Sequence, residues 1–361
     1  MKPTDDRNAA AETTDDGDAA ATTTDDGDAA AKTIDGRDAA VEPVDDRGAV
    51  VKGEGIGIGT VRDALEAVCP GIRVDGVRPL DAGYTSRQWV ADTDEGRLLV
   101  KAPVRERDPE HLRRLVATTR RAAEAGVPVV RYRAVVAHSP AFGGPMAVQE
   151  FADGTPADQL WDAMDSAARE AFAADLGSVV GRLHASAGPW FGDVLGRERH
   201  GAARAALHAL VERRLGEAPP ELRAELRAVG RALHAGVETV PMDEPASLLH
   251  GDLWRPNVLL RGGRIQCLLD FEHGGWGDRF LDFGKLEEHV FAHDPIRPAF
   301  LEAYAEVCPL PAGWEERAAL GRAVHALSMA AYFAVWNPEF VPQYTGELTE
   351  WAGRRSAWLT P

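Results

Sequence analysis

Residues 248–261 read LLHGDLWRPNVLLR, with two apolar runs on either side of a polar loop. The loop sets His250, Asp252 and Asn257 at fixed offsets. A carboxylate two residues after the histidine can orient and deprotonate an attacking hydroxyl, and an amide five residues further on can reach a metal ion carried by nucleotide phosphates. This spacing therefore predicts a phosphoryl-transfer loop in which Asp252 is the catalytic residue.

A second carboxylate follows the loop. After a glycine turn, the apolar strand expected at 265–269 leads directly to Asp270. Asp282, within the sequence DFG, competes for the metal-binding role, but it follows a turn-like segment instead of a strand. We therefore expect Asn257 and Asp270 to bind Mg²⁺. Asp282 is expected to cap a helix at 283–291 and to accept hydrogen bonds from the loop.

The segment from His250 to Asp282 closely resembles the aminoglycoside phosphotransferase family, small-molecule kinases that share the protein-kinase fold. The family pattern is HGDxxxxN, a strand, an aspartate and then GDxxxDL. The matching residues are His250, Gly251, Asp252, Asn257, Asp270, Gly277, Asp278 and Asp282, with Phe283 in place of the usual leucine. The resemblance implies an α+β, bilobal fold, with a small antiparallel β-sheet in the N-lobe and a larger, mostly helical C-lobe. It also implies that His250 supports the loop and is not a base.

The resemblance places the nucleotide, ATP or GTP, against the N-lobe. The strands of the expected five-stranded sheet are at 74–80, 88–92, 96–103, 127–136 and 146–151. Between the first two, Gly83 permits a tight turn and Ser86 can meet phosphate oxygens. Lys101 follows an apolar run at the position of the lysine that pairs the α and β phosphates. Where the chain leaves the sheet, the backbone near Glu150 and Ala152 is expected to meet the adenine edge.

The partner of Lys101 is a departure from the family pattern. In this architecture a glutamate on the next helix holds the lysine, but the helix expected at 109–125 has glutamates only near its ends, Glu110 and Glu124. Glu110 lies in the first turn and is the better candidate. The alternatives are a rearranged helix or a lysine held by phosphate alone.

The chain divides by composition. Residues 1–52 repeat with a period of ten, carry many Asp and Ala residues and no aromatic residue, and so cannot offset their ordering entropy by burial. We expect a disordered acidic tail there. A glycine-rich linker is expected at 53–59, and Thr60 is expected to cap a helix at 61–68. The N-lobe then covers 60–151 and the helical C-lobe 152–361.

Composition limits the partners. The net charge of −17 disfavours nucleic acid, because phosphate contacts need a basic face. It suits a cationic small molecule, although residues 1–50 alone contribute a net −9. No apolar run approaches the roughly 18 residues that span a bilayer, and no secretory signal is visible, so we expect a cytoplasmic enzyme that does not bind a membrane. The oligomeric state is left open.

These features predict an ATP-dependent O-phosphotransferase that acts on a hydroxyl of a small molecule. The family resemblance implies an antibiotic of the aminoglycoside type as acceptor, in resistance or self-protection. The alternative is a metabolite kinase of the amino-sugar, choline or homoserine type, and a third possibility is a catalytically silent binding module. Glu272 is a candidate contact for a cationic acceptor. A protein kinase is disfavoured, since about a dozen residues after Asp270 are too few for an activation loop.

Overall fold

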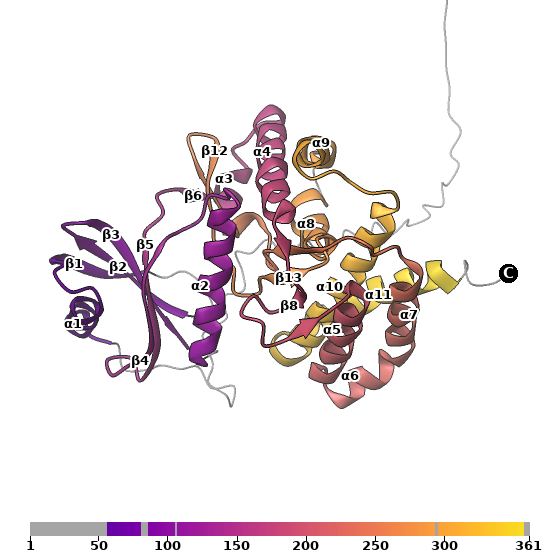
Figure 1. Cartoon of the computed structure of the whole chain (residues 1–361), viewed down its shortest axis with the longest axis horizontal. Coiled ribbons are helices and arrows are strands. Elements are labelled where there is room, and N and C mark those ends of the chain that lie inside the picture. Colours follow the sequence, from indigo (N-terminus) through magenta and orange to yellow (C-terminus); the bar gives the residue numbers. More distant parts are fainter. Residues whose placement is uncertain (1–55, 81–85, 105–106, 293–294, 357–361) are drawn as a thin grey trace, which may run out of the picture. The chain divides into compact units, whose positions relative to one another are not determined.

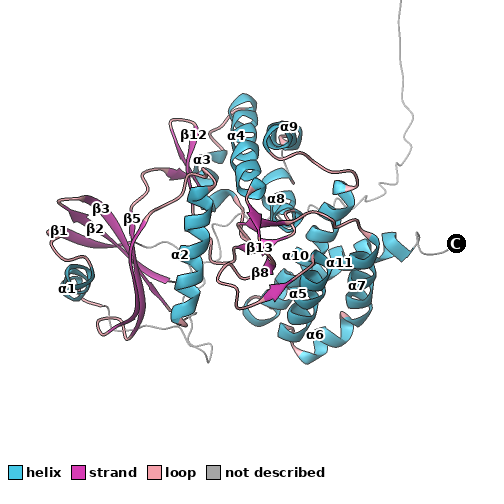
Figure 2. Cartoon of the chain, in the orientation of Figure 1, coloured by secondary structure: helices cyan, strands magenta, loops and turns pink. Residues whose placement is uncertain are grey.

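The computed structural model describes residues 56–80, 86–104, 107–292 and 295–356. Within them, a five-stranded antiparallel sheet and two helices form the N-lobe, and helices with two small sheets form the C-lobe (Figures 1 and 2). The expected α+β, bilobal fold is confirmed. Gly83, the acidic repeats of 1–52 and the first part of the linker lie outside the described residues.

The N-lobe sheet has the strand order β1-β2-β3-β5-β4. Its elements are α1 (Ile58–Val68), β1 (Val74–Leu80), β2 (Ser86–Thr93), β3 (Gly96–Pro103), α2 (Pro109–Glu124), β4 (Tyr132–Ser139) and β5 (Gly144–Glu150).

The two N-lobe helices cover opposite faces of this sheet. Val100 of β3 packs in one apolar cluster with Leu65 of α1, whereas Ala147 of β5 belongs to the cluster that contains Leu115 of α2. Successive residues of a strand point to opposite faces. Lys101, next to Val100 and paired with Ala147, therefore lies on the α2 face.

The C-lobe is mostly helical. Its helices are α3 (Ala157–Trp161), α4 (Ser166–Ala185), α5 (Ala203–Glu217), α6 (Pro220–Glu225), α7 (Arg227–Thr239), η1 (Arg255–Asn257), α8 (Phe280–Leu286), the π-helix η2 (Glu287–Phe291), α9 (Arg297–Val307), α10 (Trp314–Trp336), η3 (Pro338–Phe340) and α11 (Val341–Ser356). Its strands are β6 (Thr155–Pro156), β7 (Ala187–Gly188), β8 (Phe191–Gly192), β9 (Arg199–His200), β10 (Ala246–Leu249), β11 (Val258–Arg261), β12 (Arg264–Leu268) and β13 (Gly275–Gly277).

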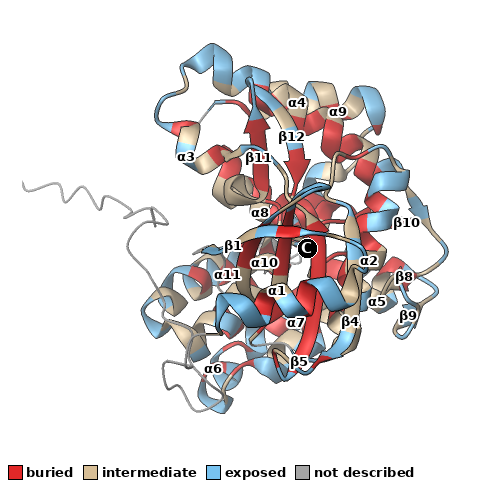
Figure 3. Ribbon diagram, turned by 90° about the vertical axis from the view of Figure 1, so that its left-hand side faces the viewer, coloured by how far each residue is buried: buried red, intermediate tan, exposed pale blue. Residues whose placement is uncertain are grey.

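Two antiparallel pairings fix the polar loops of the C-lobe. Strand β10 leads into the loop at His250 and pairs with β13. Strands β11 and β12 form a hairpin, in which Val258 lies opposite Leu268. The first three residues of β11 are buried (Figure 3). The hairpin therefore returns the chain to the same region after Asn257 and delivers Asp270 close to the loop that it left.

The helices pack closely in the core. By length and composition α10 is apolar enough to cross a membrane, but half of that apolar stretch is buried in the lobe, and it packs against α8 and α11. Two glycines allow α8 and α10 to approach. A Cβ on Gly321 would lie 2.2 Å from the carbonyl oxygen of Phe280, and one on Gly284 would lie 2.7 Å from Cβ of His325. Helix α10 is therefore a core helix.

Three boundaries differ from the sequence expectation. Helix α1 begins at Ile58 after Gly57, so the predicted capping role of Thr60 is wrong. Strand β4 begins at Tyr132, because the preceding segment runs beside β12 and the carbonyl of Pro128 accepts a hydrogen bond from the N–H of Leu268 at 2.8 Å. The helix expected at 283–291 begins at Phe280, and its second half is the π-helix η2.

Candidate active site

The backbone of the 250–252 loop is held by one buried carboxylate. Asp282 accepts hydrogen bonds from the N–H groups of His250 and Gly251, each at 2.8 Å. Gly251 has φ +79°, and a Cβ there would lie 2.3 Å from the carbonyl oxygen of His273. Only glycine fits this position without strain. The start of the loop is therefore fixed by α8 and by the absence of a side chain at 251.

His250 supports the same loop from inside. Its side chain is fully buried and stacks near Phe271, with ring centroids 4.3 Å apart. Its Nδ1 accepts a hydrogen bond from the N–H of Asp252 at 3.2 Å. Burial lowers the pKa of His250, against the opposing charges of Asp282 and Asp252. A neutral imidazole that is engaged by the backbone positions Asp252 and is not placed to act as a base.

Asp252 is held on both oxygens. Nδ2 of Asn257 donates to Oδ2 of Asp252 and to its backbone carbonyl, each at 2.9 Å, and Nζ of Lys285 pairs with Oδ1. Burial acts to raise the pKa of Asp252, but the charge and hydrogen bond of Lys285 outweigh it, so the pKa lies below its ordinary value. The side chain is thus ionised at neutral pH and fixed in direction.

Asp282 lies inside helix α8 and does not cap it. The helix begins at Phe280, and the N–H of Phe280 is bound at 3.0 Å by Asp278. The capping role predicted for Asp282 is therefore wrong. Besides the loop, Asp282 binds Nε2 of His184 at 3.1 Å, and His184 in turn contacts Tyr304. Burial acts to raise the pKa of Asp282, but the His184 contact and further positive partners lower it below its ordinary value.

Asp270 has an unusual backbone. At φ +63° it is the one non-glycine residue with a positive φ among the described residues. Such a conformation costs free energy and is typical of functional sites. Burial raises the pKa of its carboxyl, and the nearby carboxylates of Glu272 and Asp252 raise it further, against the charge of Lys101. The local field therefore favours a bound cation beside Asp270.

Glu272 turns toward the N-lobe. Its Oε2 lies 3.4 Å from Nε2 of His111 on α2, and Lys101 is among the charges that lower its pKa, although burial opposes them. Glu110, the candidate partner of Lys101, instead pairs with Arg113 and with Arg197, the latter at 2.8 Å. Lys101 thus acts on Asp270 and, more weakly, on Glu272, whereas Glu110 is engaged by two arginines.

The predicted nucleotide-side residues lie on the inner strands of the sheet, with Ser86 and Glu150 at opposite ends of them. Ser86 begins β2 opposite Pro103, two residues after Lys101. The N–H of Glu150 is already bound to the carbonyl of Arg131 at 2.8 Å, so it is not available to an adenine base. Within the described part of the chain, the N–H of Ala152 has no hydrogen-bond partner. Of the two predicted hinge contacts, the backbone of Ala152 is therefore the better placed.

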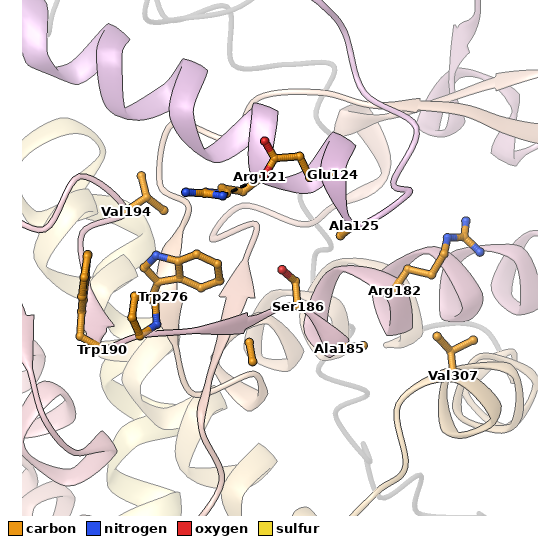
Figure 4. A pocket seen from close by; sticks show the side chains of 12 residues that line it. Arg121, Glu124, Ala125, Arg182, Ala185, Ser186, Trp190, Val194, Trp276 and Val307 are labelled. Carbon is orange, nitrogen blue, oxygen red and sulfur yellow. Dashed lines mark hydrogen bonds and ion pairs between the residues drawn. The ribbon is translucent and has the colours of Figure 1, made fainter.

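A pocket of about 480 Å³ lies apart from Asp252, between the ends of α2 and α4 and strand β13 (Figure 4). Within it, Arg121 pairs with Glu124 at 2.9 Å. It is lined by Arg121, Glu124, Ala125, Arg182, Ala185, Ser186, Ala187, Pro189, Trp190, Val194, Trp276 and Val307. None of the predicted site residues lines it, so it has no evident part in phosphoryl transfer.

Residues 76–320 match the model of the phosphotransferase enzyme family known as APH. The match covers more than half of the chain and includes the loop, the hairpin and α8. The chain belongs to this family. The resemblance of residues 250–282 and the predicted enzyme class, a phosphotransferase, are thereby confirmed.

The phosphotransferase is similar to proteins with different acceptors. A probable ketoamine kinase of Vibrio parahaemolyticus is 36% identical over 87 residues, which is 24% of this chain and 28% of that kinase. A thermostable mutant of aminoglycoside phosphotransferase APH(4)-Ia, in ternary complex with AMP-PNP and hygromycin B, superimposes with a TM-score of 0.63 at 16% identity, covering 81% of this chain and 98% of that one. Macrolide 2′-phosphotransferase MphH from Brachybacterium faecium superimposes with a TM-score of 0.54 at 23% identity, covering 76% of this chain and 92% of that one. The protein-kinase-like fold is confirmed.

Lys285, at the centre of the candidate site of this phosphotransferase, is not among the predicted site residues. Lys285 pairs with Asp252, and its Nζ also lies 4.7 Å from the ring centroid of Trp254. A signal was present, because Lys285 is three residues after Asp282, and residues at this spacing share one face of a helix. Once α8 presents Asp282 to the loop, it presents Lys285 to the same loop.

Proposed function

We propose that this phosphotransferase transfers the γ-phosphate of ATP, or of GTP, to a hydroxyl group of a small molecule. The observation that carries the proposal is the ionised carboxylate of Asp252, which is fixed by Asn257 and Lys285 at the end of a rigid loop. A fixed anion at this position accepts the proton of an attacking hydroxyl and orients its oxygen. Asp252 is therefore the catalytic residue.

The residues around Asp270 fit a divalent cation. The Asp270 carboxyl is buried beside two other carboxylates, and a hard cation such as Mg²⁺ prefers oxygen ligands of this kind. Because Nδ2 of Asn257 is occupied by Asp252, its amide oxygen is the atom left to bind an ion. When bound, Mg²⁺ neutralises charge on the nucleotide phosphates.

The remaining site residues hold the nucleotide. Lys101 lies on the α2 face of the sheet and supplies a positive charge for the α and β phosphates, with Glu272 as its counter-charge. Ser86 and Gly83 belong to the segment that covers the phosphates, and the backbone of Ala152 meets the adenine edge. We also propose that Glu272 does not contact the acceptor, because its carboxylate is engaged with His111.

For the acceptor we propose a cationic antibiotic first. Two of the similar structures are named as enzymes that phosphorylate aminoglycosides and macrolides, and one of them holds hygromycin B. The ketoamine kinase supports the second candidate, an amino-sugar type of metabolite, alongside the choline and homoserine types. A catalytically silent module is the least supported, because Asp252, Asn257 and Asp270 are all present. We propose that the enzyme works in the cytoplasm, where ATP is available. We also propose that the N-lobe ends and the C-lobe begins near residue 151.

The test is a screen of ATP-dependent mass shift against aminoglycosides, macrolides, peptide and nucleoside antibiotics, ketoamines and small amino-alcohols. A gain of one phosphoryl group on one class identifies the acceptor. Asp252→Asn should abolish this transfer while ATP binding, followed by calorimetry, is retained. Near-normal phosphorylation by Asp252→Asn would disprove the catalytic assignment, and no mass shift across the whole panel would remove the proposed acceptor classes.

A further inference from the structure

We propose that Glu288, His289 and His325 form a binding site for a borderline divalent cation, Zn²⁺, next to the active site and separate from the Asp270 carboxylate. One ligand atom of each residue lies within 4.8 Å of the others. Oε2 of Glu288 is 3.0 Å from Nε2 of His325, and Oε1 is 3.5 Å from Nε2 of His289.

These separations suit tetrahedral coordination. Zinc bonds to nitrogen and oxygen are about 2.0–2.2 Å long, which places neighbouring tetrahedral ligands about 3.2–3.6 Å apart. The two contacts of Glu288 are close to this range, and each uses a different oxygen of the carboxylate, Oε2 toward His325 and Oε1 toward His289. His289 is the most exposed of the three, at 30%, so its ring has the most room to move toward a shared ion.

The local fold accounts for the convergence. Glu288 and His289 are adjacent in the π-helix η2, a rare element that is frequent at functional sites. Neighbouring residues of an ordinary α-helix point about 100° apart, so a convergence of both side chains on one point is unusual. The close approach of α8 and α10 at Gly284, whose Cβ would meet His325, brings the third ligand alongside.

The ligand oxygen also has the support that metal sites require. Tyr344 donates its hydroxyl hydrogen to Oε1 of Glu288 at 2.7 Å, from helix α11. An outer hydrogen bond of this kind orients a ligating carboxylate and tunes its affinity. Two imidazoles with one carboxylate favour zinc over magnesium, which prefers oxygen ligands alone.

The proposed zinc site lies beside a residue of the loop that contains Asp252. Three protein ligands around zinc leave a fourth position for water or a substrate group. The His289 ring lies 5.7 Å from the Trp254 ring, and Lys285, the partner of Asp252, lies over the same indole. An ion here would therefore be within reach of the acceptor. That role rests on the proposed function, whereas the site itself does not.

The experiment uses the full chain, freed of metal by a chelator and titrated with Zn²⁺ by calorimetry and with Co²⁺ by visible absorption. We expect one ion per chain and the intense absorption of four-coordinate Co²⁺. His289→Gln and His325→Gln should each remove this absorption, and Tyr344→Phe should weaken Zn²⁺ binding by about 10–100-fold. Neither readout depends on phosphotransfer, so the result is independent of the acceptor.

His200→Gln is the matched control. Nε2 of His200 lies 3.0 Å from a carboxylate oxygen of Glu198, the same distance as in the His325 pair. This variant should bind both ions as the parent does. Absence of saturable Zn²⁺ binding, or parent-like binding by His289→Gln with an unchanged circular dichroism spectrum, would overturn the proposal. So would loss of binding on replacement of the separate surface pair His208 and His234.

Discussion

Lys285 and Asp252 form an ion pair with little solvent around it, because the two side chains are only 15% and 21% exposed. The indole of Trp254 covers the same ammonium group. A cation in this position does two things for the proposed chemistry. It fixes the direction of the Asp252 carboxylate, and it places positive charge where a transferred phosphoryl group carries negative charge.

Replacement of Lys285 by methionine is therefore expected to lower kcat by about 10²-fold. The KM for ATP should change much less, because Lys101 and not Lys285 is proposed to meet the α and β phosphates. Since Lys285 lowers the pKa of Asp252, the acidic limb of the pH profile of kcat should also move to higher pH. Lys285→Arg keeps the charge and should recover part of the activity. An unchanged kcat and pH profile in Lys285→Met would contradict this role.

Glu272→Gln is expected to reduce kcat/KM for ATP about tenfold, the equivalent of about 1.4 kcal/mol, because Lys101 loses its counter-charge. Glu110→Gln removes the same charge from the start of α2, where Glu110 pairs with Arg197 and Arg113. It should leave kcat/KM for ATP unchanged. Steady-state kinetics at a saturating acceptor concentration measure both variants, and equal effects would show that Glu272 has no special relation to Lys101.

Asp282→Ala is expected to destabilise the fold by about 3–5 kcal/mol, because it leaves three hydrogen-bond partners unsatisfied, of which His184 and His250 are buried. Asp282→Asn keeps the shape and isolates the charge. The pKa of Asp282 is lowered in the folded state, so its negative charge stabilises the fold fully at pH values above the unfolded-state pKa. This stabilisation is lost as the pH falls through the folded-state pKa. The difference in free energy of unfolding between the parent and Asp282→Asn should therefore be largest near neutral pH and shrink below about pH 4. Urea unfolding at several pH values tests this, and a difference that grows toward acid would refute it.

Gly251→Ala and Gly263→Ala form a pair that separates backbone strain from steric clash. Both glycines have similar φ, +79° and +76°, but an added Cβ meets the carbonyl of His273 at 251 and nothing within 4 Å at 263. Gly263→Ala should cost about 1–2 kcal/mol of stability. Gly251→Ala should cost about 1–3 kcal/mol more and should also lower kcat, since it displaces the loop before Asp252. Equal unfolding midpoints for the two variants would show that the 251 loop relaxes freely.

The loop at 250–257 could be predicted from the sequence because its determinants are local. The strand at 265–269, the turn before it and the spacing of His250, Asp252 and Asn257 all lie within about twenty residues, and antiparallel pairing of β11 with β12 needs only a short turn. The same locality explains why Asp270 lies beside the loop.

The misjudged features depend on packing between distant segments. The start of α8 at Phe280 moves Asp282 from a cap into the helix, and with it aligns Lys285 with Asp252. The position of Glu272 depends on α2, through the contact with His111, which lies 161 residues earlier in the chain. A charge pattern read along one segment does not reveal such partners, because ion pairs depend on distance in space and not in sequence.

Helix α8 carries both restraints on the loop, Asp282 on its backbone and Lys285 on the side chain of Asp252, and it is seated against α10 through Gly284 and Gly321. A single-residue insertion or deletion in α8 would rotate both restraints away together. We therefore expect natural and laboratory variants that change acceptor range to keep the length of α8 unchanged. In any redesign of the acceptor specificity of this chain, α8 and its glycine contacts are the part of the scaffold to keep unchanged.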